Sequence, residues 1–302
     1  MKLKGLDEFE LIKRLTSGLK KDSSIIKGVG DDAAIIKYKK DKYIILTTDI
    51  LIEDVHFKIK DAEPELIGHK SLACNISDIA ATGGFPKYAL ISLGLPKRLD
   101  FDFVNSIYKG IKKTANRYNI KIIGGDTSSS KKLIINIALL GFVDKRNIIL
   151  RSGAKAGDRI FVSGYLGGAY KKKHFSFKPR LKEALYLVEN YKINSMIDLS
   201  DGLASDLNQI LKASKVGALI YEDKIPLSKE AKDINSALYD GEDFELLFTV
   251  DKDEARRIER ISSKIIRLTE LGQIVGRDKG FKMLTHKKRM KEVSLKFTFR
   301  HF

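Results

Sequence analysis

Apolar and polar residues follow two different periods along this chain, which predicts a mixture of helices and strands. Helical spacing of apolar residues predicts helices at residues 9–19, 64–81, 101–118, 179–190 and 253–263, and another from the 198–202 turn through residue 213. Short apolar runs predict strands at residues 42–48, 88–95, 121–123, 133–143, 159–163, 196–199, 218–221 and 244–250. Both element types occur in each half of the chain.

The segment of residues 151–158, which contains Gly153 and Gly157, is the clearest candidate for a domain boundary. The chain has 302 residues, which is enough for two domains with cores of their own. Mixed helices and strands on both sides of this segment predict an α/β or α+β fold. We therefore expect an N-terminal domain at residues 1–147 and a C-terminal α/β domain at residues 148–302.

The composition predicts a globular protein without a membrane span. Hydrophobic residues make up 43% of the sequence, which is typical of a folded rather than a disordered chain. The longest nearly unbroken apolar run, residues 133–143, is interrupted by Asn136 and is too short to cross a bilayer. Residues 1–15 mix charged and apolar side chains and lack the core of a signal peptide. We expect a cytoplasmic protein.

The formal net charge of +17 raises the hypothesis of nucleic-acid binding. However, the lysines are scattered and accompany no aromatic-interleaved basic motif. A second interpretation is a thermophilic surface, because Lys and Ile are abundant, Gln occurs at two positions and Trp is absent. We favour the second interpretation and expect no nucleic-acid partner. The excess positive charge would also attract a phosphorylated substrate.

The single cysteine, Cys74, excludes an intrachain disulfide. It lies in an apolar stretch of a predicted helix. This setting favours a buried structural thiol over a reactive one.

Aspartates carry the strongest chemical signal. Seven of them lie beside Gly, Ser or Thr in five turn-like segments, usually after an apolar run: Asp31, Asp32, Asp49, Asp78, Asp126, Asp198 and Asp201. Magnesium takes oxygen ligands, keeps several waters and usually bridges to substrate phosphates. The pattern therefore predicts a phosphate-handling enzyme with a site for divalent cations.

Each segment alone also has an ordinary structural interpretation. Gly28-Val-Gly-Asp-Asp-Ala33 can be a tight turn, and Ser200 or Asp201 can cap a helix. The first segment has the spacing of a dinucleotide fingerprint, but its two carboxylates would repel a pyrophosphate. Asp78, late in its helix, opposes the helix dipole, so either a cation or solvent must compensate it.

Several common motifs are missing from the sequence. It contains no G-x-x-x-x-G-K-[ST], no protein-kinase H-R-D or D-F-G, no H-E-x-x-H and no paired C-x-x-C. This argues against a Walker-type NTPase and against a zinc enzyme. His56 and Arg151 can each be an ordinary core or surface residue, although an arginine beside a glycine-rich turn can also bind phosphate.

Taken together, the segments resemble the thiamine-monophosphate kinase family over nearly the whole chain. The segments that carry the resemblance are residues 30–34, Thr47-Thr-Asp49 with Val55-His-Phe57, residues 72–81, Gly124-Gly-Asp-Thr127, residues 151–158, Ile197-Asp-Leu-Ser-Asp-Gly-Leu203 and Gly241-Glu-Asp-Phe-Glu-Leu-Leu247. Their order along the chain is more specific than any one of them. The resemblance implies the two-domain fold of aminoimidazole ribonucleotide synthetase, with N-terminal sheets that form a barrel in a homodimer.

The resemblance also implies a reaction, in which the γ-phosphoryl group of ATP passes directly to thiamine monophosphate and gives thiamine diphosphate. Several Mg²⁺ ions would assist, with ATP as co-substrate. The implied metal ligands are Asp32, Thr47, Thr48, Asp49, Asp78, Asp126, Asp198 and Asp201. The implied ATP contacts are Tyr108, Gly125, Asp126, Arg151 and Ser200, and the implied substrate contacts are His56, Glu242 and Phe299. Asp31 receives no ligand role and is expected to support its turn.

Two departures concern the acceptor side. Asp240 stands where the family usually has glycine, and residues 297–302 match the family's C-terminal aromatic segment loosely. The alternatives within the superfamily are selenophosphate synthetase and the hydrogenase-maturation dehydratase. The former carries a reactive Cys or selenocysteine near its N-terminus and the latter ends in cysteine, whereas this sequence ends Arg300-His-Phe302.

Overall fold

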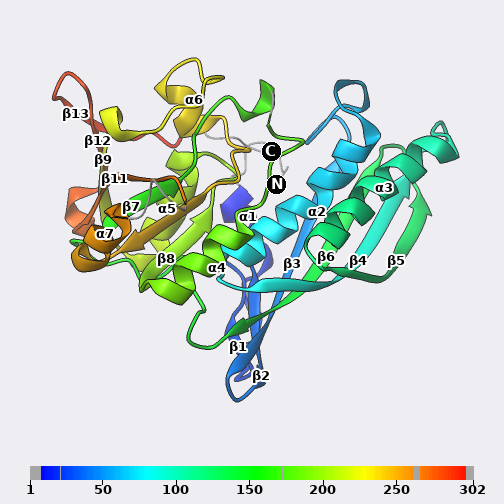
Figure 1. Cartoon of the computed structure of the whole chain (residues 1–302), viewed down its shortest axis with the longest axis horizontal. Helices are drawn as coiled ribbons and strands as arrows, with labels where there is room; N and C mark the ends of the chain where they lie inside the picture. Colours follow the sequence, from blue (N-terminus) through cyan, green and yellow to red (C-terminus); the bar gives the residue numbers. More distant parts are fainter. Residues whose placement is uncertain (1–7, 21, 172, 261–265, 297–302) are drawn as a thin grey trace.

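The strands of the computed structural model, which describes residues 8–20, 22–171, 173–260 and 266–296, form two sheets (Figure 1). The six-stranded sheet has the order β1-β2-β3-β6-β4-β5 and the seven-stranded sheet the order β13-β12-β9-β11-β7-β10-β8. The first contains β1 Ile25–Lys27, β2 Ala34–Lys39, β3 Lys42–Ile52, β4 Phe85–Leu95, β5 Lys121–Ser129 and β6 Ile134–Asp144. The second contains β7 Arg159–Ser163, β8 Ile193–Asp198, β9 Gly217–Tyr221, β10 Leu246–Val250, β11 Leu268–Val275, β12 Phe281–Leu284 and β13 Met290–Glu292.

Helices pack on both sheets and between them. The α-helices are α1 Glu8–Leu15, α2 Pro64–Ala81, α3 Phe101–Arg117, α4 Leu181–Asn190, α5 Leu203–Ser214, α6 Ile234–Tyr239 and α7 Lys252–Glu259. The short 3-10 helices are η1 Ile59–Asp61, η2 Ala169–Lys171, η3 Glu222–Lys224 and η4 Arg277–Lys279. In the part of the chain that the structure describes, none of these helices is long and apolar enough to cross a membrane.

Helix α2 joins the two halves (Figure 1). It packs on β3 and β6 of the first sheet and on α4 and β8 of the second half. Its side chains Ile67, Leu72 and Ile76 are fully buried in a core that also contains Met196 and Phe248 from the second sheet. One continuous apolar core therefore holds the two sheets at a defined distance, and α2 runs along their junction.

Two glycines let α2 and α3 approach closely. A Cβ atom at Gly110 would lie 1.9 Å from the carbonyl oxygen of Glu65, and one at Gly68 would lie 2.0 Å from that of Ile107. Glycine is therefore required where the two backbones touch. This contact fixes α2 against the layer that covers the first sheet.

Side chains of the first sheet alternate between a buried and an exposed face. On β3, Tyr43 and Ile45 point toward α2 and are buried, whereas Leu46 and Ile50 point the other way and are exposed. Leu90 on β4 lies on the same exposed face, because it pairs with Ala138 and Ala138 pairs with Thr48. In the single chain this sheet is open, with β1 and β5 at its edges.

The strongly periodic elements agree with the sequence-based prediction, and α2 matches its expected range. Several strands are longer than predicted: β3 continues to Ile52 and β5 to Ser129, and β4 begins at Phe85 and β8 at Ile193. The reason is pairing, because the ladder between β3 and β6 continues across the polar residues Thr47, Thr48 and Asp49. The expectation that Asp49 and Asp126 lie in turns is therefore wrong, since both lie inside paired strands.

Other differences concern short elements. Helix α1 ends at Leu15, four residues earlier than predicted, and Gly18 follows at a φ of +86°. The strands β1, β2, β11, β12 and β13 and the helix α6 were not predicted. Strands as short as β1, with three residues, are stabilised by their neighbours in the sheet rather than by a local pattern.

Candidate functional site

A cleft of about 630 Å³ opens where the two halves meet. The first half contributes the turn before β2, the strand β3 and the last turns of α2, and the second half contributes turns after β8 and α6. The cleft is lined by the predicted site residues Asp32, Thr47, Thr48, Asp49, His56, Asp78, Arg151, Ser200, Asp201 and Glu242. The fold thus brings together segments that lie up to about two hundred residues apart in the sequence.

The end of α2 meets β3 through a short hydrogen bond. Thr47 Oγ1 donates to Asp78 Oδ2 at 2.5 Å. Strand alternation places Thr47 and Asp49 on the α2 side of the sheet and Thr48 on the exposed face. There Thr48 Oγ1 accepts from Asn136 Nδ2 at 3.0 Å. The side chains of Thr48 and Asp49 therefore point to opposite faces.

Crowding of carboxyl groups controls the electrostatics of the cleft. Burial raises the pKa of Asp32 to about 7 and the pKa values of Asp49 and Asp198 to about 6. Burial also raises the pKa of Asp78 well above its usual range, and the charges of Asp49 and Asp198 raise it further. The charge of Glu242 acts on Asp49 in the same direction. Shifts of this sign indicate a site with more buried negative charge than positive charge to balance it.

Arg151 and the turn before β2 hold each other in place. The Arg151 Nη2 and Nε atoms donate to Asp32 Oδ1 at 2.7 and 3.1 Å. The backbone nitrogen of Arg151 donates to Asp31 Oδ1 at 3.1 Å, and Lys27 Nζ lies 3.2 Å from Asp31 Oδ2. Asp31 therefore supports its turn, as expected, and ties it to the second half of the chain.

The end of β8 and the turn after it supply two carboxylates, Asp198 and Asp201. Asp198, buried at the end of β8, accepts a hydrogen bond from Ser77 Oγ of α2 at 2.5 Å. Helix α5 has Gly202 at its N-cap and no side-chain cap, so the capping interpretation of Ser200 and Asp201 is wrong. Both residues line the cleft instead.

A buried lysine, which the sequence interpretation did not identify, organises the acceptor end of the cleft. Lys70 of α2 is 1% exposed, and its Nζ lies 2.7 Å from Glu242 Oε2. The same atom lies 3.4 Å from the carbonyl oxygen of His56 and from His174 Nδ1. A lysine within a helix that is apolar on most sides was the available signal, because such a residue needs a buried partner.

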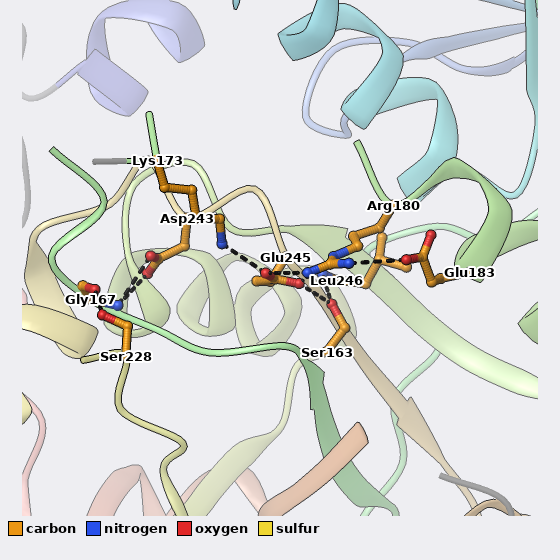
Figure 2. Close-up of polar contacts among 9 residues, drawn as sticks. All are labelled: Ser163, Gly167, Lys173, Arg180, Glu183, Ser228, Asp243, Glu245 and Leu246. Carbon is orange, nitrogen blue, oxygen red and sulfur yellow. Dashed lines mark hydrogen bonds and ion pairs between the residues drawn. The ribbon is translucent and has the colours of Figure 1, made fainter. Parts of the chain in front are cut away.

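Side chains of residues 241–247 point alternately to two sides. Glu242 and Phe244 line the cleft, and both have positive φ angles, of 60° and 47°. Asp243 and Glu245 point away from it into a network of polar contacts that Figure 2 shows. The same short segment therefore supplies two residues of the cleft and the buried carboxylates that fix its backbone in place.

That network ties residues 163–183 to the segment (Figure 2). Asp243 accepts from the backbone nitrogen of Gly167 at 2.9 and 3.0 Å. Glu245 accepts from Lys173 Nζ at 2.7 Å, from Arg180 Nε at 2.6 Å and from Ser163 Oγ at 2.6 Å. The Glu245 side chain is 1% exposed, so these bonds form away from solvent.

Some predicted residues lie elsewhere. Tyr108 on α3, Gly125 and Asp126 on β5, and Asp198 at the end of β8 do not line the cleft. Successive pairing of Asp49 with Ile137, Ile137 with Ile91 and Ile91 with Gly125 places β5 three strands from β3. At about 4.8 Å per strand this is roughly 14 Å, too far for one Mg²⁺ ion to be bound by both strands. Phe299 lies outside the described residues.

The cleft fits a magnesium ion that is shared with a ligand better than one enclosed by protein. Within the described ranges, no three His, Cys, Asp or Glu side chains form a group that could hold a metal ion. The Oδ2 atoms of Asp32 and Asp49 are nevertheless buried without a hydrogen-bond partner. Magnesium is usually bound by one or two carboxylates together with waters and substrate phosphates. Two carboxylates with unpartnered oxygens, Asp32 and Asp49, in an open cleft fit this description.

Cys74 is buried, as predicted, and lies beside Phe177 and Phe244. Burial and the charge of Asp49 raise the pKa of its thiol. It therefore stays a neutral thiol rather than a reactive thiolate.

Comparison with known sequences identifies both halves of the chain. Residues 30–143 match the AIR synthase related protein, N-terminal domain, and residues 130–284 match the AIR synthase related protein, C-terminal domain. The thiamine-monophosphate kinase of Buchnera aphidicola subsp. Schizaphis graminum is 36% identical, over 98% of this chain and 99% of the relative. That of Bacillus subtilis is 35% identical, over 89% of this chain and 91% of the relative.

Solved structures agree with these sequence matches. AaThiL complexed with AMPPCP and TMP superposes with a TM-score of 0.86 at 33% identity, covering 100% of this chain and 99% of that one. The thiamine monophosphate kinase of Aquifex aeolicus gives a TM-score of 0.78 at 30% identity, covering 97% and 100%. The hydrogenase maturation protein HypE in complex with ATP shares the fold, with a TM-score of 0.70 at 19% identity over 94% of each chain.

Proposed function

The chain belongs to the thiamine-monophosphate kinase family of AIR synthase related proteins, and we propose that its cleft carries out that family's reaction. The γ-phosphoryl group of ATP passes to the phosphate of thiamine monophosphate, and thiamine diphosphate and ADP are formed. The observation that carries the proposal is the convergence of buried carboxylates from both halves on one cleft, next to Arg151 and Glu242.

Magnesium belongs to this proposal. The residues that would hold it in the cleft are Asp32, Thr47, Asp49, Asp78 and Asp201, with Asp198 buried beside them at the end of β8. The side chain of Thr48 points to the other face of the sheet, and Asp126 on β5 would be contributed by a second copy of the chain. When bound, Mg²⁺ neutralises charge on the phosphates and fixes their orientation. The orphaned oxygens of Asp32 and Asp49 support this assignment, because a buried carboxylate oxygen without a donor is stabilised by a cation.

The side chains of the cleft serve mainly to align the two substrates. The acceptor is itself a phosphate that is ionised at neutral pH, so the reaction needs no general base. Arg151, held by Asp32 at the mouth of the cleft, is placed to donate to phosphate oxygens, and Ser200 lines the same wall. His56 and Glu242 mark the acceptor end, with Lys70 fixing the Glu242 carboxylate. Phe299 completes this end by the family resemblance alone.

The ATP contacts on α3 and β5 call for a second copy of the chain. Tyr108, Gly125 and Asp126 lie outside the cleft of their own chain. The exposed apolar face of the first sheet supports a homodimer, because large patches of this kind mark association surfaces. Its exposed residues include Leu46, Ile50 and Leu90. Two such sheets facing each other would form the barrel that the resemblance implies.

The division into domains at residues 1–147 and 148–302 is part of the same proposal. The strand β6 ends at Asp144 and β7 begins at Arg159, which is compatible with this boundary. A cytoplasmic location and a thermophilic origin stay predictions from the sequence.

The direct test is an assay with ATP, thiamine monophosphate and Mg²⁺, in which thiamine diphosphate is followed by mass spectrometry at moderate and elevated temperature. We expect one thiamine diphosphate for each ADP formed. The absence of product under all these conditions would overturn the proposed function, as would ADP formation that does not depend on thiamine monophosphate.

A further inference from the structure

Tyr170 lies at the border between two cavities. It belongs to the short helix η2 and is 46% exposed. It lines both the main cleft and a neighbouring pocket of about 340 Å³. His56, the predicted substrate residue, also lines both cavities. The two spaces therefore meet between His56 and Tyr170.

The phenol group of Tyr170 belongs to the electrostatic environment of the cleft. Burial raises its pKa well above the usual range, and the carboxylates of Glu242, Asp201 and Asp240 raise it further. Its hydroxyl group therefore stays protonated at neutral pH and can donate a hydrogen bond. Tyr170 thus lies between the carboxylates that line the cleft and the pocket beyond.

One side of the neighbouring pocket is aromatic, formed by Tyr170, His174 and Phe175. The ring centroids of Tyr170 and His174 are 5.1 Å apart, and those of His174 and Phe175 are 3.9 Å apart. Burial and the charge of Lys70 lower the pKa of His174 to about 4, so its ring is neutral at physiological pH. The pocket is also lined by Asp54, Lys58 and Asp61.

The segment that carries Tyr170 is fixed on both sides by the network in Figure 2. Before Tyr170, the backbone nitrogen of Gly167 donates to Asp243. After it, Lys173 Nζ donates to Glu245 at 2.7 Å. Since both anchors are buried carboxylates, little ordering remains to be done when a ligand binds.

We propose that Tyr170, backed by His174, binds the ring end of the acceptor. This inference rests on the proposed function. Thiamine monophosphate carries a phosphate at one end and a flat, cationic heteroaromatic system at the other. An aromatic wall attracts such a cation and stacks on its rings. Asp61 adds a favourable charge, whereas Asp54 is already paired with Lys132. The phosphate then faces the cleft while the rings occupy the pocket beyond His56 and Tyr170.

Two substitutions and one matched control test the inference. Tyr170→Ala removes the aromatic face, and Tyr170→Phe retains it while removing the hydroxyl group. Tyr165→Ala is the control, because Tyr165 is also 46% exposed but lines a different cavity and contacts Arg267. Since Tyr170 is half-exposed, its replacement should leave the fold intact, which melting curves verify.

We expect Tyr170→Ala to raise the KM for thiamine monophosphate about tenfold or more, the loss typical of a stacking contact. The KM for ATP should stay within about twofold of wild type, because Tyr170 faces the acceptor. Tyr170→Phe should retain most of the acceptor affinity, and Tyr165→Ala should match wild type. An unchanged KM for thiamine monophosphate in Tyr170→Ala, or an equal rise in Tyr165→Ala, would overturn the inference.

Calorimetric titration separates this inference from the proposed function. Thiamine monophosphate is titrated into wild type and Tyr170→Ala in the presence of AMPPCP and Mg²⁺, so that no turnover is needed. Weaker binding by Tyr170→Ala supports the ring subsite, and equal binding rejects it even if the kinase reaction is real. A wild-type protein that neither binds nor phosphorylates thiamine monophosphate would reject both.

Discussion

Residue by residue, the cleft is defined by carboxyl groups that burial should disfavour. Asp32 has Arg151 as a partner, but one of its oxygens and one of Asp49's are buried without a hydrogen bond. An unpaired buried charge is costly, and a protein keeps it where a ligand compensates it. We infer that Mg²⁺, bound together with the nucleotide phosphates, balances the negative charge that the protein's own groups leave uncompensated.

Asp78→Asn should leave a folded protein with little kinase activity. The pKa of Asp78 is raised by burial and by Asp49, so the neutral acid is favoured in the metal-free protein and asparagine resembles it. Its Oδ1 can still accept from Thr47. We expect a melting temperature near that of wild type and a loss of kcat/KM of about 100-fold or more.

The control for Asp78→Asn is Asp41→Asn, at an exposed position in the turn between β2 and β3. It should leave turnover unchanged. Wild-type turnover in Asp78→Asn would contradict the assignment of this residue to the metal site.

The effect of Mg²⁺ on stability should depend on pH. The folded-state pKa values of Asp32, Asp49 and Asp198 are raised to between about 6 and 7, so the metal-free folded protein binds more protons than the unfolded chain from about pH 4 upward. Its stability should therefore fall as the pH rises through this window. Mg²⁺ must displace these protons, so it should raise the melting temperature more at about pH 8 than at about pH 5.5.

Thermal melts with and without Mg²⁺ at both pH values test this expectation. Samples treated with a chelator, and therefore free of divalent cations, give the baseline. A stabilisation by Mg²⁺ that is equal at the two pH values would show that these carboxyl groups do not bind it.

Among the elements, α2 has the most connections to the site. Its last turns present Ser77 to Asp198 and Asp78 to Thr47, and its middle presents Lys70 to Glu242. One helix therefore contacts both sheets and sets the width of the cleft. Close packing against α3 through Gly68 and Gly110 fixes its position.

Arg180→Met should destabilise the fold through Glu245. Arg180 is 30% exposed, but Glu245 is 1% exposed and would lose two of its donors. Lys173 and Ser163 would still contact Glu245, so its buried charge would be only partly compensated, and we expect the free energy of unfolding to fall by about 2–3 kcal/mol. Urea denaturation measures this loss.

Arg256→Met is the matched control, since Arg256 pairs with Asp253 on the surface of α7, where the two side chains are 62% and 89% exposed. An exposed pair of this kind contributes less than about 1 kcal/mol. Equal losses in the two variants would show that burial of Glu245 gives its ion pair no special weight.

At the scale of the whole molecule, the first sheet of a single chain leaves one apolar face exposed. The exposed residues Leu46, Ile50 and Leu90 lie on one face, and the predicted ATP residue Asp126 lies on the edge strand β5. A partner that covers this face would bury apolar surface and could bring β5 toward a second cleft. Association and activity are then linked.

Leu90→Lys should weaken the proposed homodimer, because it places a charge in the centre of an apolar interface. We expect light scattering after gel filtration to give a dimer mass for wild type and a shift toward the monomer for the variant, with reduced activity. Phe101→Lys is the control, since Phe101 is 79% exposed but begins α3, on the other side of the sheet. A wild-type monomer with full activity would reject the homodimer.

The sequence by itself determined the family, the aspartates that line the cleft and the helices with strong apolar periods, of which α2 is the clearest. These features depend on residue type and local spacing, which the sequence displays directly. The ordered set of short segments identified the reaction although each segment alone had an ordinary structural interpretation.

Only the tertiary structure decided how these pieces meet. It placed Asp49 and Asp126 three strands apart inside paired strands, revealed Lys70 beneath Glu242, and brought Tyr170 to the border of the cleft. Strand pairing, burial and the contacts of a buried charge depend on partners distant in sequence. Local patterns carry no information about those partners, so this part of the site became visible only in the folded chain.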